Sequence, residues 1–343
     1  MPFNNKYITE LDMEISSFCN AECIDCPRIW TQYDQVFAFN PYIDNFNKTV
    51  PLEDLKKHIA QFENLERIDM CGNKGDPLGH PDIAELVQWC FDTYDDMDLV
   101  VDTNGSLGNT KTWKALASTP VQVNFSIDGL EDTNHIYRRK VVWEKVMRNA
   151  YTFLGHGGFG VWKAVDFPHI RHQFDTMNHF SKAMGFKKFS VVPQHNPENA
   201  QKIVESSEVE INHTEKANAI PIGESELTKD HTTSLDWFEK NKIIPYCIRK
   251  QESKTTQSLY YENGKVYPCC TYAQNGYSEE HTRQLDHART EELYGENWNS
   301  LYHHSLETIL AGDYYSQYLE NSWTDPNTAF KICKVKCGKC LTS

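Results

Sequence analysis

Three cysteines near the N-terminus have a spacing that suits metal chemistry. Cys19, Cys23 and Cys26 form the pattern C-x3-C-x2-C. Such a group of thiolates is typical of a zinc site or an iron–sulfur cluster. Three thiolates hold three irons of a cubane and leave the fourth iron open to an exogenous ligand, as a catalytic metal site requires. A closed zinc site is the alternative, but it needs a fourth ligand, and the first histidine of the chain is His58.

A second group of cysteines lies towards the C-terminus, at positions 247, 269, 270, 333, 337 and 340. Four thiolates fully ligate a 4Fe–4S cluster, and a zinc ribbon built on a hairpin is the alternative. This grouping favours metal sites over a disulfide framework. Two cysteines are solitary: Cys90 falls on the apolar face of a predicted helix and is assigned to the core, whereas Cys71 ends a predicted strand.

The elements that must position these residues alternate along the chain. Strand-like runs cover 8–16, 67–71, 98–104, 121–128, 161–167 and 188–193. Helical patterns cover 52–62, 81–93, 110–117, 141–154 and 174–184. This alternation predicts parallel βαβ units. We therefore expect an α/β fold with a partial (β/α)6 TIM-like barrel. A doubly wound open sheet is the alternative, although no G-x-G-x-x-G follows the first strand.

The rest of the chain differs in composition. Residues about 200 to 234 are polar and acidic with little periodicity, which indicates an excursion or lid-like loop. Beyond them, two β-prone runs flank Asn263-Gly264 and predict a β-hairpin, followed by a helix over 301–310. The expected domains are a barrel over 1–199, an insert with a connecting helix over 200–244, and a small C-terminal hairpin and helix domain over 245–343.

Polar residues follow three of the predicted strands. They are Gly72-Asn73-Lys74-Gly75-Asp76-Pro77 after the second, Asp102-Thr103-Asn104-Gly105 after the third and Ser126-Ile127-Asp128-Gly129 after the fourth. Each is an ordinary turn when taken alone. However, the carboxyl ends of barrel strands are where barrel active sites form. The sequence therefore predicts one site that brings these segments near the first cysteine group.

In this order, the motifs resemble those of the radical S-adenosylmethionine (SAM) superfamily. The resemblance implies that Cys19, Cys23 and Cys26 hold a 4Fe–4S cluster whose open iron binds SAM. Reductive cleavage would then give methionine and a 5′-deoxyadenosyl radical that abstracts a hydrogen atom. The implied SAM-binding residues are Gly75, Asp76, Pro77, Thr103, Asn104, Ser126, Asp128, Arg138 (with Arg139 as its alternative) and Val192. One departure is Asp25, because the position before the third cysteine is usually aromatic in this superfamily.

The C-terminal cysteines resemble the auxiliary-cluster domain called twitch or SPASM. The match consists of a cysteine before a hairpin, G-x4-C on its return strand and a closing C-x2-C. It implies a second 4Fe–4S cluster on Cys247, Cys269, Cys337 and Cys340, with Cys333 as the spare thiol. Among relatives of this kind, a thiol placed like Cys71 donates a hydrogen atom to a substrate radical; a small core residue is the alternative.

Charge and hydropathy limit the partners. The chain carries 34 basic and 48 acidic residues among 343, a formal charge of −14, which disfavours a long nucleic-acid partner. The sequence contains no run of about 18 apolar residues, so it predicts no membrane span. The N-terminus lacks a secretory pattern, so we expect a cytoplasmic protein. The resemblance implies a peptide, protein side chain or small polar metabolite as substrate and a flavodoxin- or ferredoxin-type electron donor. The alternative of another class is a zinc-binding structural or interaction protein on an α/β scaffold.

Overall fold

The computed structural model describes residues 3–24, 26, 28–32, 36–39, 48–194, 200–205, 212–216, 238, 241–250, 255–273, 286, 289–325, 328–330, 333–334 and 337–340. The chain divides into two compact units. The barrel unit comprises Met13–Leu52 and Ile68–Asn218, and the tail unit comprises Met1–Asp12, Glu53–Arg67 and Ala219–Ser343. The expected domains are continuous in sequence, whereas the tail unit includes two N-terminal segments.

Contacts within the tail unit explain why those two segments belong to it. His58, in the second segment, is 1% exposed, and its Nδ1 lies 2.9 Å from Tyr261 Oη. Glu10, in the first segment, forms an ion pair with Arg249 at 3.0 Å. Sequence periodicity cannot reveal such pairings, because their partners lie about 200 residues or more away along the chain.

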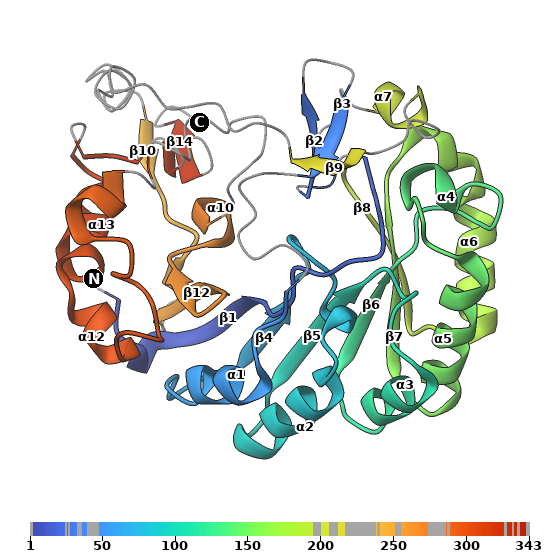
Figure 1. Cartoon of the computed structure of the whole chain (residues 1–343), viewed down its shortest axis with the longest axis horizontal. Coiled ribbons are helices and arrows are strands. Elements are labelled where there is room, and N and C mark those ends of the chain that lie inside the picture. Colours follow the sequence, from blue (N-terminus) through green and yellow to red (C-terminus); the bar gives the residue numbers. More distant parts are fainter. Residues whose placement is uncertain are drawn as a thin grey trace. The chain divides into compact units, whose positions relative to one another are not determined.

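The barrel unit is built on parallel strands (Figure 1). In sheet order these are β1 (Ile8–Glu14, which leads in from the tail unit), β4 (Arg67–Met70), β5 (Asp98–Thr103), β6 (Gln122–Ser126), β7 (Phe159–Val165) and β8 (Lys188–Val192). All six lie where the sequence predicts strands. The register pairs Thr103 with Phe125 and Ser126 with Lys163, so consecutive strands end at one edge. The predicted α/β partial barrel is confirmed.

Helices cover the outer face of these strands (Figure 1). They are α2 (Ile83–Thr93), α3 (Thr110–Ala117), α5 (Trp143–Gly155) and α6 (Phe174–Met184). Two short helices, α4 (Asn134–Tyr137) and α7 (Ala200–Glu205), contact each other at the end where the strands finish (Figure 1), and 3-10 turns cover Pro77–Gly79 and Pro168–Gln173. Asn109 caps α3 by accepting two backbone N–H bonds. Between α3 and β6, Trp113 stacks on Phe125 at 5.1 Å. Cys90 is fully buried on α2, which confirms its place in the core.

A small sheet completes the described part of the barrel unit. It contains β2 (Ile29–Gln32), β3 (Val36–Phe39) and β9 (Asn212–Lys216). Strands β2 and β3 follow the first cysteine group directly and pair antiparallel, whereas β9 pairs parallel to β3. Part of the segment expected as a lid-like loop thus forms a helix and a strand; most of the remainder lies outside the described residues.

The tail unit contains the predicted hairpin. Its strands are β12 (Thr255–Glu262) and β13 (Lys265–Tyr267), joined by Asn263 and Gly264 at φ 47° and 80°. Positive φ at both central residues is what a tight two-residue turn requires. The other elements are a 3-10 turn (Asn5–Tyr7), α1 (Leu52–Ile59), β10 (Asn241–Ile243), β11 (Ile248–Lys250), α10 (Cys270–Ala273), α12 (Leu306–Ala311), a π-helical turn (Tyr314–Tyr318), α13 (Leu319–Asn321) and β14 (Gly338–Cys340). In the described part of the chain, no helix combines the length and apolarity needed to cross a bilayer.

Candidate active site

A cavity of about 630 Å³ lies at the carboxyl ends of the barrel strands. Its lining includes ten residues that the sequence predicts for one site: Cys19, Cys23, Cys26, Cys71, Gly75, Asp76, Thr103, Asn104, Ser126 and Arg138. Val192 lines it as well, beside Pro193 at the end of β8. Two predicted residues outside the lining, Pro77 and Asp128, are buried. The structure therefore gathers residues from well-separated parts of the sequence around one volume.

The first cysteine group forms a series of turns over this cavity. The N–H of Cys26 donates to the carbonyl of Cys23 at 3.1 Å, and the carbonyl of Cys26 accepts from Ile29 at 2.8 Å. The loop is anchored where Glu22 donates its N–H to the Arg139 carbonyl at 3.0 Å. All three thiols are free of disulfides. Asp25, which the sequence singles out, lies outside the described residues.

Burial determines the ionisation of these thiols. It raises the pKa of Cys19 to about 12, with a further increase from the nearby Asp76 carboxylate. It also raises the pKa of Cys23 to about 12, against the opposing influence of Arg138. Metal ligation requires the thiolate, so loading this site must displace protons.

The donor set fits an iron–sulfur cluster. Three thiols face one cavity, and amide and guanidinium groups stand beside them. Within the described ranges, no three His, Cys, Asp or Glu side chains surround a single point as ligands of one ion do. A cubane makes a different demand on the protein, because each thiolate binds its own iron at a separate corner.

Asp76 binds protein groups on every side. Its Oδ1 accepts the Leu78 N–H at 2.9 Å, and its Oδ2 accepts the Asn104 N–H at 2.8 Å. The hydroxyl of Thr103 donates to the same carboxylate at 2.8 Å. The side chain is 3% exposed, and burial raises its pKa although these hydrogen bonds oppose the rise. The sequence predicts a carboxylate turned towards SAM; in the structure Asp76 lines the cavity and its carboxylate also ties the loop after β4 to the end of β5.

Gly75 allows that loop to approach the first strand. A Cβ at this position would stand 2.0 Å from the Ser16 carbonyl oxygen, so only glycine fits. The same loop also donates a hydrogen bond to this segment, from the Asp76 backbone N–H to the Phe18 carbonyl at 2.8 Å. The segment immediately before Cys19 is therefore held by the loop after β4.

Asn104 reaches the first cysteine. Its Nδ2 lies 3.5 Å from Cys19 Sγ and donates to Asn20 Oδ1 at 3.0 Å. Its Oδ1 accepts from Ser106, both from the N–H at 2.8 Å and from the hydroxyl at 2.6 Å. The amide is thus fixed in orientation with one N–H directed at the thiol. The resemblance places this motif near the SAM ribose; the contact with Cys19 was not predicted.

Arg138 and Asp128 form a buried ion pair. Arg138 Nε lies 2.6 Å from Asp128 Oδ2, and Asp128 is fully buried. Asp128 Oδ1 accepts the Val165 N–H, so the carboxylate joins β7 to this arginine. The guanidinium also lies against the Tyr137 ring, 5.1 Å from its centroid. The ion pair holds the Arg138 guanidinium at the cavity, close enough to the Cys23 thiol to oppose the rise in its pKa.

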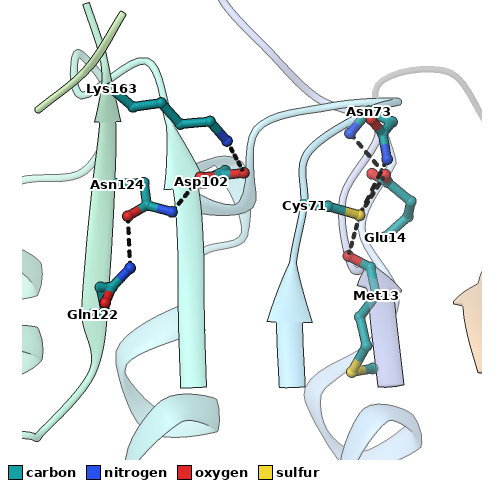
Figure 2. A network of polar contacts seen from close by, with 8 residues as sticks. All are labelled: Met13, Glu14, Cys71, Asn73, Asp102, Gln122, Asn124 and Lys163. Carbon is teal, nitrogen blue, oxygen red and sulfur yellow. Dashed lines mark hydrogen bonds and ion pairs between the residues drawn. The ribbon is translucent and has the colours of Figure 1, made fainter. Parts of the chain in front are cut away.

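Cys71 lies within a polar cluster at the ends of β1 and β4 (Figure 2). Its Sγ stands 3.4 Å from Glu14 Oε1 and receives the Asn73 Nδ2–H at 3.1 Å. Glu14 is only 4% exposed and accepts the backbone N–H groups of Asn73 and Lys74. Because Cys71 lines the cavity, its thiol is accessible to a bound ligand.

A second polar cluster lines the opposite part of the inner face and was not predicted (Figure 2). Lys163 of β7 forms an ion pair with Asp102 of β5 at 2.9 Å. Asn124 of β6 donates to Asp102 at 2.8 Å and accepts from Gln122 at 2.9 Å. The available signal was the alternation of polar residues along β6, because every second residue of a strand faces the same side.

A second cavity, of about 180 Å³, lies in the tail unit. Its lining includes Cys247, Cys269, Cys270, Cys333 and Cys337, together with Tyr246 and Tyr272. The side chain of Cys340, a predicted ligand, lies outside the described residues. Two other predicted ligands, Cys247 and Cys269, belong to the hairpin region, as the sequence indicates.

Comparison with known proteins extends this description. No protein-family model and no curated protein matches the chain. Among solved structures, Streptococcus suis SuiB bound to S-adenosylmethionine matches at TM-score 0.51 and 16% identity, over 96% of this chain and 77% of that one. This chain has the fold of SuiB. The fold expected from the radical SAM resemblance is therefore confirmed.

Two further structures share the fold. SuiB bound to precursor peptide SuiA matches at TM-score 0.51 and 14% identity, over 96% of this chain and 76% of that one. Native anSMEcpe with bound AdoMet and Cp18Cys peptide matches at TM-score 0.50 and 14% identity, over 96% and 86%. At these identities the likeness establishes the fold alone.

Proposed function

We propose that this chain is a radical SAM enzyme that cleaves SAM reductively in the barrel cavity. Cys19, Cys23 and Cys26 would hold a 4Fe–4S cluster, which would supply the electron for that cleavage; the 5′-deoxyadenosyl radical released from SAM would then abstract hydrogen from a C–H bond of the substrate. The observation that carries the proposal is the convergence of these three thiols with the residues that follow the parallel strands. Structures that share the fold contain S-adenosylmethionine, which supports it.

The chain's own residues would bind and orient the ligands. Asn104 directs an N–H at the Cys19 sulfur, and hydrogen bonds to sulfur tune a cluster's potential. Arg138, held by Asp128, offers a cation for the SAM carboxylate, because a guanidinium fork suits that group. Gly75 brings backbone close to the ligand, and Ser126 presents a hydroxyl from the end of β6.

The proposed substrate is a peptide or protein side chain, or a small polar metabolite. A peptide is favoured because two structures that share the fold are described with bound peptides. The polar inner face formed by Lys163, Asp102 and Asn124 suits polar groups of either substrate class. We assign Cys71 as the hydrogen-atom donor to the substrate radical; one electron and one proton would then return the thiyl radical on Cys71 to the thiol. A flavodoxin- or ferredoxin-type protein would deliver electrons.

A second 4Fe–4S cluster is proposed in the tail unit, where it would assist electron transfer or substrate binding. Its support is the cavity lined by Cys247, Cys269 and Cys337. Four thiolates saturate such a cluster, so it would not bind SAM as the first cluster does. The second cluster can therefore be removed while the first one is kept.

Metal analysis and SAM turnover test the proposal. Reconstituted anaerobically, the chain should hold about eight irons with matching sulfide, as two 4Fe–4S clusters require. With SAM and a reductant it should release 5′-deoxyadenosine. Cys23→Ala should abolish this product and lose about four irons, those of one cluster, whereas Cys90→Ala, a core cysteine in α2, should retain both. Zinc without sulfide, or normal 5′-deoxyadenosine from Cys23→Ala, would refute the proposal in favour of the zinc-binding alternative or another cofactor site.

A further inference from the structure

We propose that Cys333 is the fourth ligand of the tail cluster, with Cys247, Cys269 and Cys337, and that Cys340 is not a ligand. This inference rests on the proposed function, which places a cluster in the tail unit. It departs from the sequence prediction, which treats Cys333 as spare and closes the cluster with the C-x2-C pair.

The first support is the shared cavity. Cys333 and Cys337 both line the 180 Å³ volume that Cys247 and Cys269 line from the hairpin side. Cys333 and Cys337 also have helical backbone, and the Lys334 N–H donates to the Phe330 carbonyl at 3.2 Å, as in a helical turn. Four thiols from three separated segments thus line one cavity, as complete ligation of a cubane requires.

The second support is the burial of these thiols. Cys247 is buried, and Cys269, Cys333 and Cys337 are partly buried. All four line the same cavity, and none of them is an exposed surface thiol.

Backbone geometry separates Cys340 from this group. Gly338–Cys340 forms β14, which pairs antiparallel with β10 through Ile243↔Gly338 and Asn241↔Cys340. The Ile244 N–H continues that pairing by donating to the Cys337 carbonyl at 2.9 Å. Three residues of extended strand carry the backbone about 10 Å away from Cys337. Cys340 therefore lies at the far end of a strand that begins directly after Cys337, whereas the two cysteines of a chelating pair are usually held in one turn.

Cys270 is the remaining alternative, because it also lines the cavity. It directly follows Cys269 at the start of α10, and successive helical side chains diverge by about 100°. Cys269 Sγ receives the Tyr272 N–H at 3.4 Å, the kind of bond that stabilises a thiolate ligand. Cys270 Sγ instead stands 3.9 Å from Thr271 Oγ1. We therefore assign Cys269 as the ligand and Cys270 as its unligated neighbour.

Differential alkylation of the wild-type holoprotein tests the assignment without any substitution. Iodoacetamide labelling is compared, cysteine by cysteine, before and after the clusters are removed with a chelator and reductant. Reactivity of Cys333 should increase on cluster removal to the same extent as that of Cys247. Reactivity of Cys340 should be equal in the two states. A cluster-dependent Cys340 together with a cluster-independent Cys333 would overturn the inference.

Iron counts in the full-length variants provide the second measurement. Cys333→Ser should lose about four irons, one cluster's worth, while Cys340→Ser and Cys270→Ser keep the wild-type number. In Cys333→Ser, an unchanged EPR response of the remaining cluster to SAM shows that the barrel unit is intact. Full iron in Cys333→Ser, or loss in Cys340→Ser, contradicts the assignment. If the wild-type protein instead held only about four irons, it would have a single cluster. The second cluster of the proposed function would then be wrong, and this inference would be wrong as well.

Discussion

Asp76 has two competing roles that a substitution can separate. If its carboxylate contacts SAM, Asp76→Asn should weaken SAM binding and leave the free energy of unfolding unchanged. The structure instead directs the carboxylate at Leu78 N–H, Asn104 N–H and the Thr103 hydroxyl. In Asp76→Asn, an amide N–H₂ replaces one acceptor, and whichever way the amide turns, it meets a backbone donor. We therefore expect both stability and SAM affinity to fall.

The magnitude follows from the number of donors left without a partner. One unsatisfied buried N–H costs about 1–3 kcal/mol, so Asp76→Asn should lose about that much. Asp76→Ala leaves two backbone donors, for a loss of about 2–6 kcal/mol before the relief from removing a buried charge. Each kcal/mol lowers the melting temperature by about 2–4 °C in a unit of this size. Asp82→Asn is the control, because that exposed carboxylate makes no capping bond and should change stability by less than about 0.5 kcal/mol.

Anaerobic thermal melting, calorimetric SAM titration and amide hydrogen exchange together measure these effects. Exchange at the Leu78 and Asn104 amides should accelerate in Asp76→Asn, because those two N–H groups lose their acceptor. A variant that melts like wild type, exchanges normally at both amides and still binds SAM weakly would show that Asp76 acts on the ligand. The proposed link between the two loops would then be wrong.

Two other substitutions test one unit at a time. Gly75→Ala should displace the segment before the first cysteine group, because the added Cβ would clash with the Ser16 carbonyl oxygen. Iron counting on this variant should show that the barrel cluster is lost and the tail cluster is kept. Gly155→Ala is the control, because its added Cβ meets nothing within 4 Å and both clusters should remain. Burial lowers the pKa of His58, so the folded tail unit favours neutral imidazole: its stability should be complete above the unfolded pKa of about 6.5 and decrease as pH falls below it. His58→Gln removes that titration, so its melting temperature should vary less than that of wild type between pH 7.5 and 5.5, and an identical pH profile would contradict the assignment.

Elements with a strong local signal were predictable from the sequence. The six barrel strands and the helices between them follow from apolar periodicity, and the hairpin follows from Asn263-Gly264, which adopts the positive φ values its turn requires. Convergence of the motifs also followed, because parallel strands place their carboxyl ends at one edge. Ten of the predicted residues, together with Val192, line one cavity.

Side-chain partners far apart in the sequence were not predictable. Asp76 pairs with Thr103 and Asn104, and Lys163 pairs with Asp102, 61 residues away. A carboxylate in a glycine-rich turn has the same sequence signature whether it binds a ligand or the neighbouring loop. The closing cysteines present the same difficulty, because C-x2-C indicates a chelating turn only when the segment is not extended. In this chain the residues that follow Cys337 form a strand, and only their backbone pairing with β10 reveals this.

The inner face of the barrel has a consequence for what the cavity can bind. Strands of a parallel sheet are usually apolar on both faces. In β6, however, Val123 and Phe125 are fully buried, while the alternate residues Gln122, Asn124 and Ser126 are polar and partly exposed. Only one face of β6 therefore packs against the helices, and its other face is polar and partly exposed. Lys163 and Asp102 neutralise each other within that polar face. A polar ligand that displaces water from this face therefore leaves neither the Lys163 ammonium nor the Asp102 carboxylate as an unpaired buried charge.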